Sequence, residues 1–289
     1  MIYALIAATL FAFVDIAWRR ILPDVSIWRA LFWRSLASSA LLLTAALLWE
    51  DLSGLTAWSI KEAFHHLAWP MVTGVLGLVF FSLALQVAAA QLVVPIINLT
   101  GLFVWLWEWG WFGRVEQAGI LSALAILLAA HGVAWWVVPA WRGQSASKSD
   151  AVGAGLSLLA VLTWSRGYVE YPAALAHVPP FALAGSVELA MLIAGAVAFL
   201  WVGRTMGSGQ RRGALGVGVA VAAAVACVTL AYARIPASEV GLLSMLTPVL
   251  VVATDRLWLR TPFRRQDVVA IVSLLMANGL YLLAAIAAP

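Results

Sequence analysis

The chain has 289 residues, of which 64% are hydrophobic and only 10% carry a formal charge. A soluble protein uses about a quarter charged residues, because polar side chains must cover its surface. This composition excludes a soluble protein with a separate catalytic domain, so we expect an integral membrane protein with about ten spans of roughly 20 residues.

The formal net charge of +4 indicates membrane lipid as the partner of the loop arginines, and we expect no nucleic acid as a partner. The single cysteine, Cys227, lies in an apolar run, which excludes a disulfide framework and a thiolate metal cluster. We expect neither a metal nor a cofactor. Residues 1–14 lack the basic start of a signal peptide, so they are expected to begin a retained first helix.

Apolar runs separated by charged clusters predict ten membrane helices, since transmembrane strands would alternate in polarity over about ten residues. The first five are expected at residues 2–18, 28–48, 68–89, 92–112 and 117–138. A polar segment at 142–150 is expected to be a flexible linker between two five-helix units, residues 1–141 and 151–289. The second five helices are expected at residues 152–170, 180–202, 213–233, 238–258 and 268–287.

The two halves repeat with a shift of 147 residues, which aligns Glu108 with Asp255 and Trp111 with Trp258. Because each unit has an odd number of helices, the second unit enters the membrane the opposite way up, as in inverted-repeat transporters. We therefore predict an all-α integral membrane fold in which ten transmembrane helices form two inverted five-helix repeats.

Lysine and arginine gather in the loops that follow odd-numbered helices. The opposite side of the membrane holds only Lys61, Arg114 and Arg234. The positive-inside rule then places the odd-numbered loops in the cytoplasm and both termini outside. We expect a multi-pass protein of the cell membrane, specifically a bacterial inner membrane.

Residues 235–248, followed by an apolar turn that ends at Asp255, resemble the EamA repeat of the drug/metabolite transporter superfamily. The Thr-Trp-Ser run at 163–165 is similar to the Trp-containing first helix of that repeat. The first half departs from the pattern, because Gly101 stands where a proline is expected and Pro95 comes six residues earlier, in the first predicted turn of its helix. The resemblance implies a ten-helix exporter of amino acids or other small metabolites, with the first, third and fourth helices of each unit around the solute. Many such relatives have cytoplasmic termini, in contrast to the loop charges of this chain.

Ionisable side chains inside a bilayer are costly and usually face a cavity or a partner. Three such residues, Asp15, Arg34 and Glu188, lie within predicted helices 1, 2 and 7. Helices 2 and 7 correspond under the repeat, so we expect a mid-membrane attraction between Arg34 and Glu188. A structural ion pair, or an Arg34 that extends to the interface, is the alternative. Glu188 or Asp15 is the candidate for proton coupling, and Arg34 for a structural role.

Uncharged polar and aromatic side chains in the middle of the spans are candidate solute contacts. A hydroxyl in a helix usually bonds the carbonyl one turn before it, whereas an asparagine satisfies itself less readily. Pro248 removes one backbone hydrogen bond from its helix, which makes it a candidate hinge. Deep aromatic rings can stack on an aromatic solute or attract an organic cation. The candidate substrate-binding residues are Asn98, Trp105, Trp164, Tyr168, Tyr232 and Ser244.

These features predict a secondary transporter, not an enzyme, that moves a small metabolite by alternating access, with amino acids as the first candidates. The chain lacks the Gly-rich Lys-Ser/Thr loop that binds nucleotide phosphates, so the energy must come from a gradient or from the solute itself. Protons are the candidate coupling ion. The alternative is a membrane-embedded protein that acts on lipid, either a flippase or an enzyme for lipid-linked substrates. The sequence is compatible with a monomer or a homodimer.

Overall fold

The computed structural model describes residues 1–21, 25–53, 60–88, 90–110, 120–143, 148–201, 206–259 and 264–287. Nearly all of these residues are helical, and no strand occurs within these ranges. Five helical segments are long and apolar enough to cross a membrane: 27–49, 65–87, 92–110, 180–200 and 208–232. The predicted all-helical membrane class is therefore confirmed.

The helices of the first half are α1 (Ile2–Ile21), α2 (Ile27–Trp49), α4 (Ile60–Val87), α5 (Ala90–Ile97), α6 (Thr100–Gly110) and α7 (Ile120–Gly143). Those of the second half are α8 (Lys148–Leu175), α9 (Pro180–Trp201), α10 (Ser208–Tyr232), α11 (Ala237–Ser244), α12 (Thr247–Leu259) and α13 (Arg265–Ala287). Helix occupies both ends of the expected 142–150 linker, and residues 144–147 lie outside the described residues. The division into two units stays a prediction.

Two of the predicted spans are each interrupted by a short turn. The expected helix at 92–112 is divided into α5 and α6 at residues 98–99, and the expected helix at 238–258 is divided into α11 and α12 at residues 245–246. The ranges of α5 and α11 are offset by 147 residues, as are the starts of α6 and α12. This offset is the shift that the sequence indicates for the repeat. With each interrupted helix counted once, the described helices form ten units.

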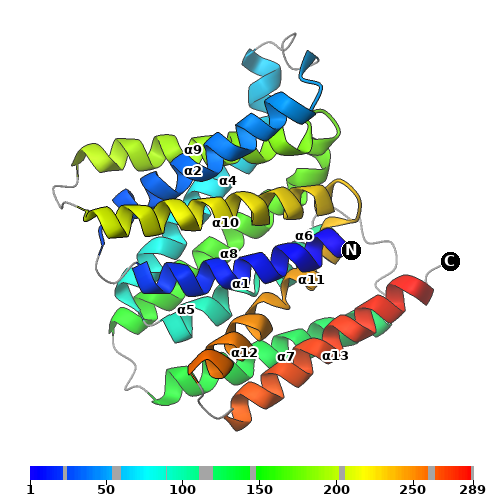
Figure 1. The fold of residues 1–289 in the computed structure, drawn as a ribbon. Helices are drawn as coiled ribbons and strands as arrows, with labels where there is room; N and C mark the ends of the chain where they lie inside the picture. The colour runs from blue at the N-terminus through cyan, green and yellow to red at the C-terminus, as the bar shows by residue number, and fades with distance from the viewer. Residues whose placement is uncertain are drawn as a thin grey trace.

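Helices from the two halves pair throughout the bundle: α2 packs on α9, α4 on α8, α1 on α10 and α7 on α13. Figure 1 shows both chain ends at one end of the bundle, called here the termini end; the opposite end, where α1 ends and α2 begins, is the far end. Large apolar side chains such as Leu47, Trp49 and Leu200 are exposed on the outside. This pattern fits helices whose outer surfaces contact lipid.

Candidate solute cavity

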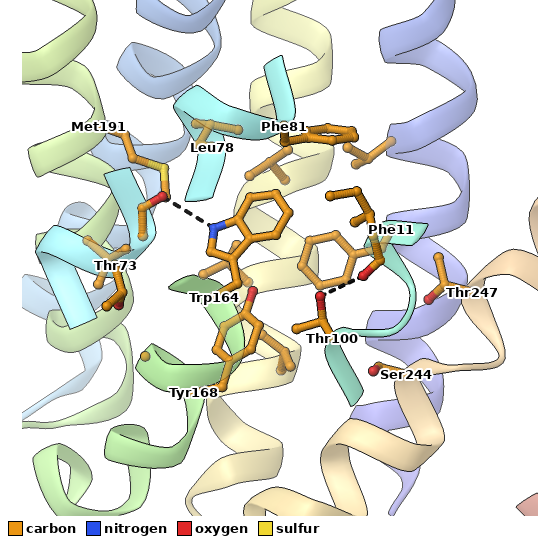
Figure 2. Close-up of a pocket in the computed structure, with 18 of the residues that line it drawn as sticks. Phe11, Thr73, Leu78, Phe81, Thr100, Trp164, Tyr168, Met191, Ser244 and Thr247 are labelled. Atoms are coloured by element: carbon orange, nitrogen blue, oxygen red, sulfur yellow. Dashed lines mark hydrogen bonds between the residues drawn. The ribbon is translucent and has the colours of Figure 1, made fainter. Parts of the chain in front are cut away.

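A cavity of about 190 Å³ lies in the middle of the bundle, and every described helix except α7 and α13 contributes to its lining. Figure 2 shows aromatic rings and hydroxyl groups around it. Most of the predicted site residues line this cavity, although they come from seven different parts of the chain: Asp15, Arg34, Asn98, Trp164, Tyr168, Glu188, Tyr232 and Ser244.

Two predicted site residues lie outside the lining. Trp105 is buried on α6, where its ring stacks on that of Trp109 with centroids 5.4 Å apart. Gly101 and Val104 lie on the face of α6 that borders the cavity. The rotation of the helix turns Trp105 away from this face, so the ring does not make the expected contact with a solute in the cavity. Pro248 is the second residue of α12 and is buried directly after the break, next to the lining residue Thr247.

Trp164 on α8 forms a wall of the cavity and is held in place by α4. Its indole N–H donates to the Gly74 carbonyl at 3.3 Å, and its ring lies against Phe81 at 5.6 Å. A Cβ atom at Gly77 would collide with the indole ring. Gly77 therefore gives the indole ring its space against α4, and Gly74 supplies the carbonyl that accepts its N–H.

Three tyrosine rings, from Tyr168, Tyr171 and Tyr232, form a cluster on the lining of the cavity. Tyr232 is the last residue of α10, and this helix ends at the termini end of the bundle (Figure 1). Tyr168 stacks on Tyr232 at 5.6 Å, and Tyr171 contacts both rings at 5.5 and 5.3 Å. We call these residues the tyrosine cluster. Sequence reasoning missed Tyr171, although it lies one helical turn after Tyr168 and so shares its face.

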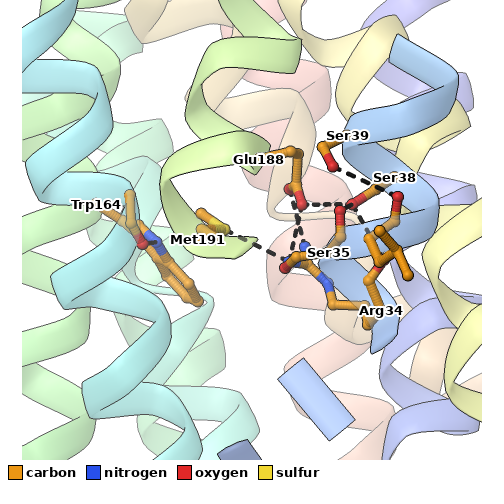
Figure 3. A network of polar contacts seen from close by, with 9 residues as sticks. Arg34, Ser35, Ser38, Ser39, Trp164, Glu188 and Met191 are labelled. Carbon is orange, nitrogen blue, oxygen red and sulfur yellow. Dashed lines mark hydrogen bonds and ion pairs between the residues drawn. The ribbon is translucent and has the colours of Figure 1, made fainter. Parts of the chain in front are cut away.

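The predicted attraction between Arg34 and Glu188 is a bidentate ion pair between α2 and α9 (Figure 3). Both guanidinium Nη atoms donate to the carboxylate at 3.0 Å, and the Ser38 hydroxyl donates to Oε2 at 2.6 Å. Arg34 is 8% exposed and Glu188 is 1% exposed. The alternative in which Arg34 extends to the interface is therefore excluded, and the pair is a buried link between the two halves.

The other described titratable groups do not gather into a metal site. Arg166 pairs with Glu170 at 2.6 Å and lies over the Trp69 ring. The His66 and His177 rings lie 4.2 Å apart in a tilted arrangement. Among the described residues, no three His, Cys, Asp or Glu side chains are grouped so as to hold a metal ion.

Hydroxyl groups of the lining come from both interrupted helices and from α4. Thr100 and Ser244 donate to carbonyls of their own chain segment, whereas Thr247 donates to the Ala8 carbonyl of α1 at 3.3 Å. Thr73 of α4 is a further lining residue that sequence reasoning missed. A single threonine in an apolar run gives no signal that separates a cavity-lining position from a lipid-facing one.

A family model described as the EamA-like transporter family matches residues 151–284. No curated protein matches the sequence significantly. Solved structures do match, 29 chains in all; one crystal structure of a protein has a TM-score of 0.81 at 16% identity and covers 98% of this chain and 96% of its own. At this identity the likeness shows the fold alone.

Proposed function

Since the second half of this chain belongs to the EamA-like transporter family, we propose that the protein exports a small metabolite, amino acids first, by alternating access between two inverted repeats. The family transports solutes, so the chain is a multi-pass membrane transporter in general terms. The observation that carries the finer proposal is the cavity between the two interrupted helices. Irregular backbone at membrane depth is tolerated where it lines a cavity, and transporters bind solutes at such breaks.

The packing of the helices supports an inverted repeat. Under the shift of 147 residues α1 corresponds to α8, and α4 to α10. The contact of α4 with α8 and the contact of α10 with α1 are then the same contact made twice. In Figure 1 α1 runs away from the termini end and α8 runs toward it, as opposite insertion of the two units requires.

One-sided closure supports alternating access. At the termini end α6 packs on α11, where Gly101 and Gly241 bring their backbones together. The corresponding pair under the repeat, α5 with α12, makes no comparable contact within the described residues. We propose that the tyrosine cluster, in which Tyr232 ends α10, closes the same end as the glycine contact. If the contact of α6 with α11 separated while α5 closed on α12, the cavity would open on the opposite side of the membrane.

Solute counterflow in liposomes tests the transport proposal directly. We expect labelled amino acids to accumulate transiently in vesicles that are preloaded with the same unlabelled solute, and not in empty vesicles. A screen that also contains nucleosides and organic cations covers other metabolites. Movement of labelled lipid without counterflow of any solute would overturn the proposal in favour of a lipid-acting protein.

Thiol labelling tests whether the cavity contains water. In a Cys227→Ser background, Val217→Cys places a thiol on the lining of the cavity, and Val219→Cys places one on the outer face of the same helix, where the valine is 53% exposed. We expect an impermeant reagent to label the first thiol from one side of the membrane only, and transported solute to slow this reaction. The second thiol is the matched control and should not respond to solute. Equal behaviour of the two thiols would contradict a wet central cavity.

We further propose that Glu188 or Asp15 couples proton movement to transport. Both line the cavity, but the carboxylate of Glu188 is engaged by Arg34 and Ser38, so coupling through Glu188 requires the ion pair to separate during the cycle. Glu188→Gln and Asp15→Asn separate the two candidates. The variant that lacks the proton-carrying carboxylate should lose uptake driven by a pH gradient but retain counterflow. Full pH-driven uptake in both variants would show that neither residue couples protons to transport.

A further inference from the structure

A charged pair on the outer surface of the bundle lies apart from the solute cavity. On α8 the Arg166 guanidinium donates to the Glu170 carboxylate at 2.6 Å, and neither residue lines the cavity. Both side chains are partly exposed. Ionisable groups that face hydrocarbon are costly, so a pair in this position is expected to lie at the level of the lipid headgroups.

An exposed tryptophan supports this depth. Trp69 of α4 lies near the start of the membrane-length segment 65–87 and is 53% exposed. The guanidinium carbon of Arg166 lies 5.2 Å from the centre of the Trp69 ring. Tryptophan is enriched where headgroups meet hydrocarbon, and an arginine is attracted to the face of its ring. The surface between α4 and α8 therefore presents a tryptophan, a cation and an anion together at the headgroup level.

Exposed apolar side chains continue from this polar surface toward the middle of the bundle. On α4 they are Val72 and Leu76, which follow the tryptophan at helical spacing. On α8 they are Leu162 and Leu159, which precede the charged pair by one to two turns. Because α4 packs on α8, the two stripes offer an acyl chain a surface that leads up to the charges.

The order of the two charges matches a zwitterionic phospholipid. α8 runs toward the termini end (Figure 1), so Arg166 lies deeper in the membrane than Glu170. Four residues of a helix rise about 6 Å. In an ethanolamine phospholipid the phosphate adjoins the acyl chains and the ammonium lies farther out, so the deeper cation meets the phosphate and the outer carboxylate meets the ammonium. Charge-assisted hydrogen bonds of this kind are strong.

The carboxylate has the capacity for a second donor. Arg166 bonds Oε1 of Glu170, whereas an ionised carboxylate has two oxygens with about four acceptor positions. A primary ammonium carries three N–H donors. A trimethylated ammonium carries none, so the structure of this pair favours the primary form.

We propose that the surface formed by Trp69, Arg166 and Glu170, called here the headgroup site, binds phosphatidylethanolamine as a membrane lipid. Arg166 binds the phosphate, Glu170 accepts the ammonium donors, and the acyl chains lie along the apolar stripes of α4 and α8. On the cavity side of the same two helices, a Cβ atom at Gly167 would collide with Thr73, and both residues line the cavity. A lipid bound to both helices therefore stabilises a wall of the cavity from outside.

Lipid retention by the purified protein tests the assignment. The protein is incubated in detergent with equal amounts of phosphatidylethanolamine, phosphatidylcholine and phosphatidylglycerol that have identical acyl chains, and bound lipid is measured by native mass spectrometry. The choline lipid has no N–H donor, and the glycerol lipid has no ammonium. We expect the ethanolamine lipid to be retained about tenfold more than either competitor, because each competitor loses the charged hydrogen bonds to Glu170. Retention of either competitor equal to that of the ethanolamine lipid would overturn the assignment.

Variants connect the preference with the headgroup site. Glu170→Gln should remove the preference for the ethanolamine lipid over the choline lipid, and Arg166→Gln should lower retention of the ethanolamine and glycerol lipids alike. Arg234→Gln is the matched control, because Arg234 lies over the Tyr3 ring at 4.7 Å but donates to the Leu230 carbonyl. An ethanolamine preference that survives Glu170→Gln, or that Arg234→Gln also removes, would contradict the headgroup site.

Thermal unfolding supplies a second measurement. The ethanolamine lipid should raise the Tm of the wild-type protein more than the choline lipid does. Glu170→Gln should lose this difference, while its Tm in detergent alone stays close to that of the wild type and shows that the variant is folded. A difference between the two lipids that is unchanged in Glu170→Gln would overturn the assignment. Neither measurement involves counterflow, so failure of the headgroup site leaves the transport proposal standing, and failure of transport leaves the headgroup site standing.

Discussion

The two halves of the molecule interrupt their fourth helix at equivalent places but with different residues. The first break lies at residues 98–99 and is followed by Gly101, whereas the second lies at 245–246 and is followed by Pro248, the equivalent position. Gly101 meets the backbone of Gly241 in α11, whereas α12, which carries Pro248, makes no contact of comparable extent with α5 among the described residues. The interruption itself is therefore a feature of the repeat. The identity of the residue after it, glycine or proline, depends on what packs against that position in each half.

The largest effect should come from the buried ion pair between Arg34 and Glu188, which joins the halves. Glu188→Gln leaves the Arg34 guanidinium in the interior without its counter-charge, so we expect a loss of about 3–5 kcal/mol in the free energy of unfolding. Denaturation in detergent measures this loss. Glu170→Gln is the matched control, because its pair with Arg166 is partly exposed and should contribute at most about 1 kcal/mol.

The double variant Arg34→Leu with Glu188→Leu sharpens this prediction. Apolar side chains of similar volume often replace a buried pair without loss, so the double variant should recover most of the stability that Glu188→Gln loses. Equal losses in the single and double variants would mean that volume, and not charge, explains the effect.

The difference between the two breaks predicts the next largest effect. Gly101→Ala places a Cβ atom against the Gly241 backbone, which cannot give way as a side chain can. We expect a loss of about 1–3 kcal/mol in stability, as for overpacking, together with loss of counterflow because the termini end no longer closes. Gly279→Ala on α13, where an added Cβ meets nothing within 4 Å, should retain both. Full counterflow by Gly101→Ala would show that the glycine contact plays no part in closure.

The ten helices were accessible from the sequence because apolar runs of membrane length are bounded by charge, and their expected ends lie close to those observed for most helices. The ion pair was accessible for a related reason, since a buried charge in lipid requires a partner. The first break was not accessible. Pro95 was expected in the first turn of its helix, but α5 begins at Ala90 and places this proline in its last turn.

Side-chain direction was the other limit of sequence reasoning. Trp105 lies on the expected helix, but the rotation of α6 turns Val104 to the cavity and Trp105 to Trp109. That rotation is set by packing between helices that are distant in sequence, such as α6 on α11. An apolar helix in lipid lacks the polar outer face that would mark the rotation in a soluble protein.

The tyrosine cluster is a second asymmetry between the halves and predicts a smaller effect. Under the repeat Tyr232 corresponds to Leu85 of α4. Tyr232→Leu should therefore give the termini end the leucine that the far end has at the equivalent position. We expect the free energy of unfolding to fall by about 0.5–1.5 kcal/mol because the ring contacts are lost. We expect the Val217→Cys thiol to react from the termini side in this variant. Tyr281→Leu on α13, outside the lining, serves as the control, and unchanged sidedness in Tyr232→Leu would contradict a gating role of the cluster.

The smallest effect should come from the proline that sequence reasoning identified as a hinge. Pro248 lies in the first turn of α12, where a backbone N–H has no partner within the helix. The first half is interrupted at the equivalent place without a proline, so Pro248→Ala should leave the second break in place, with a change in stability below about 1 kcal/mol and with counterflow retained. Denaturation and counterflow measured beside Gly101→Ala check this order of effects. A larger loss in Pro248→Ala than in Gly101→Ala would show that proline, and not the repeated packing, interrupts the second helix.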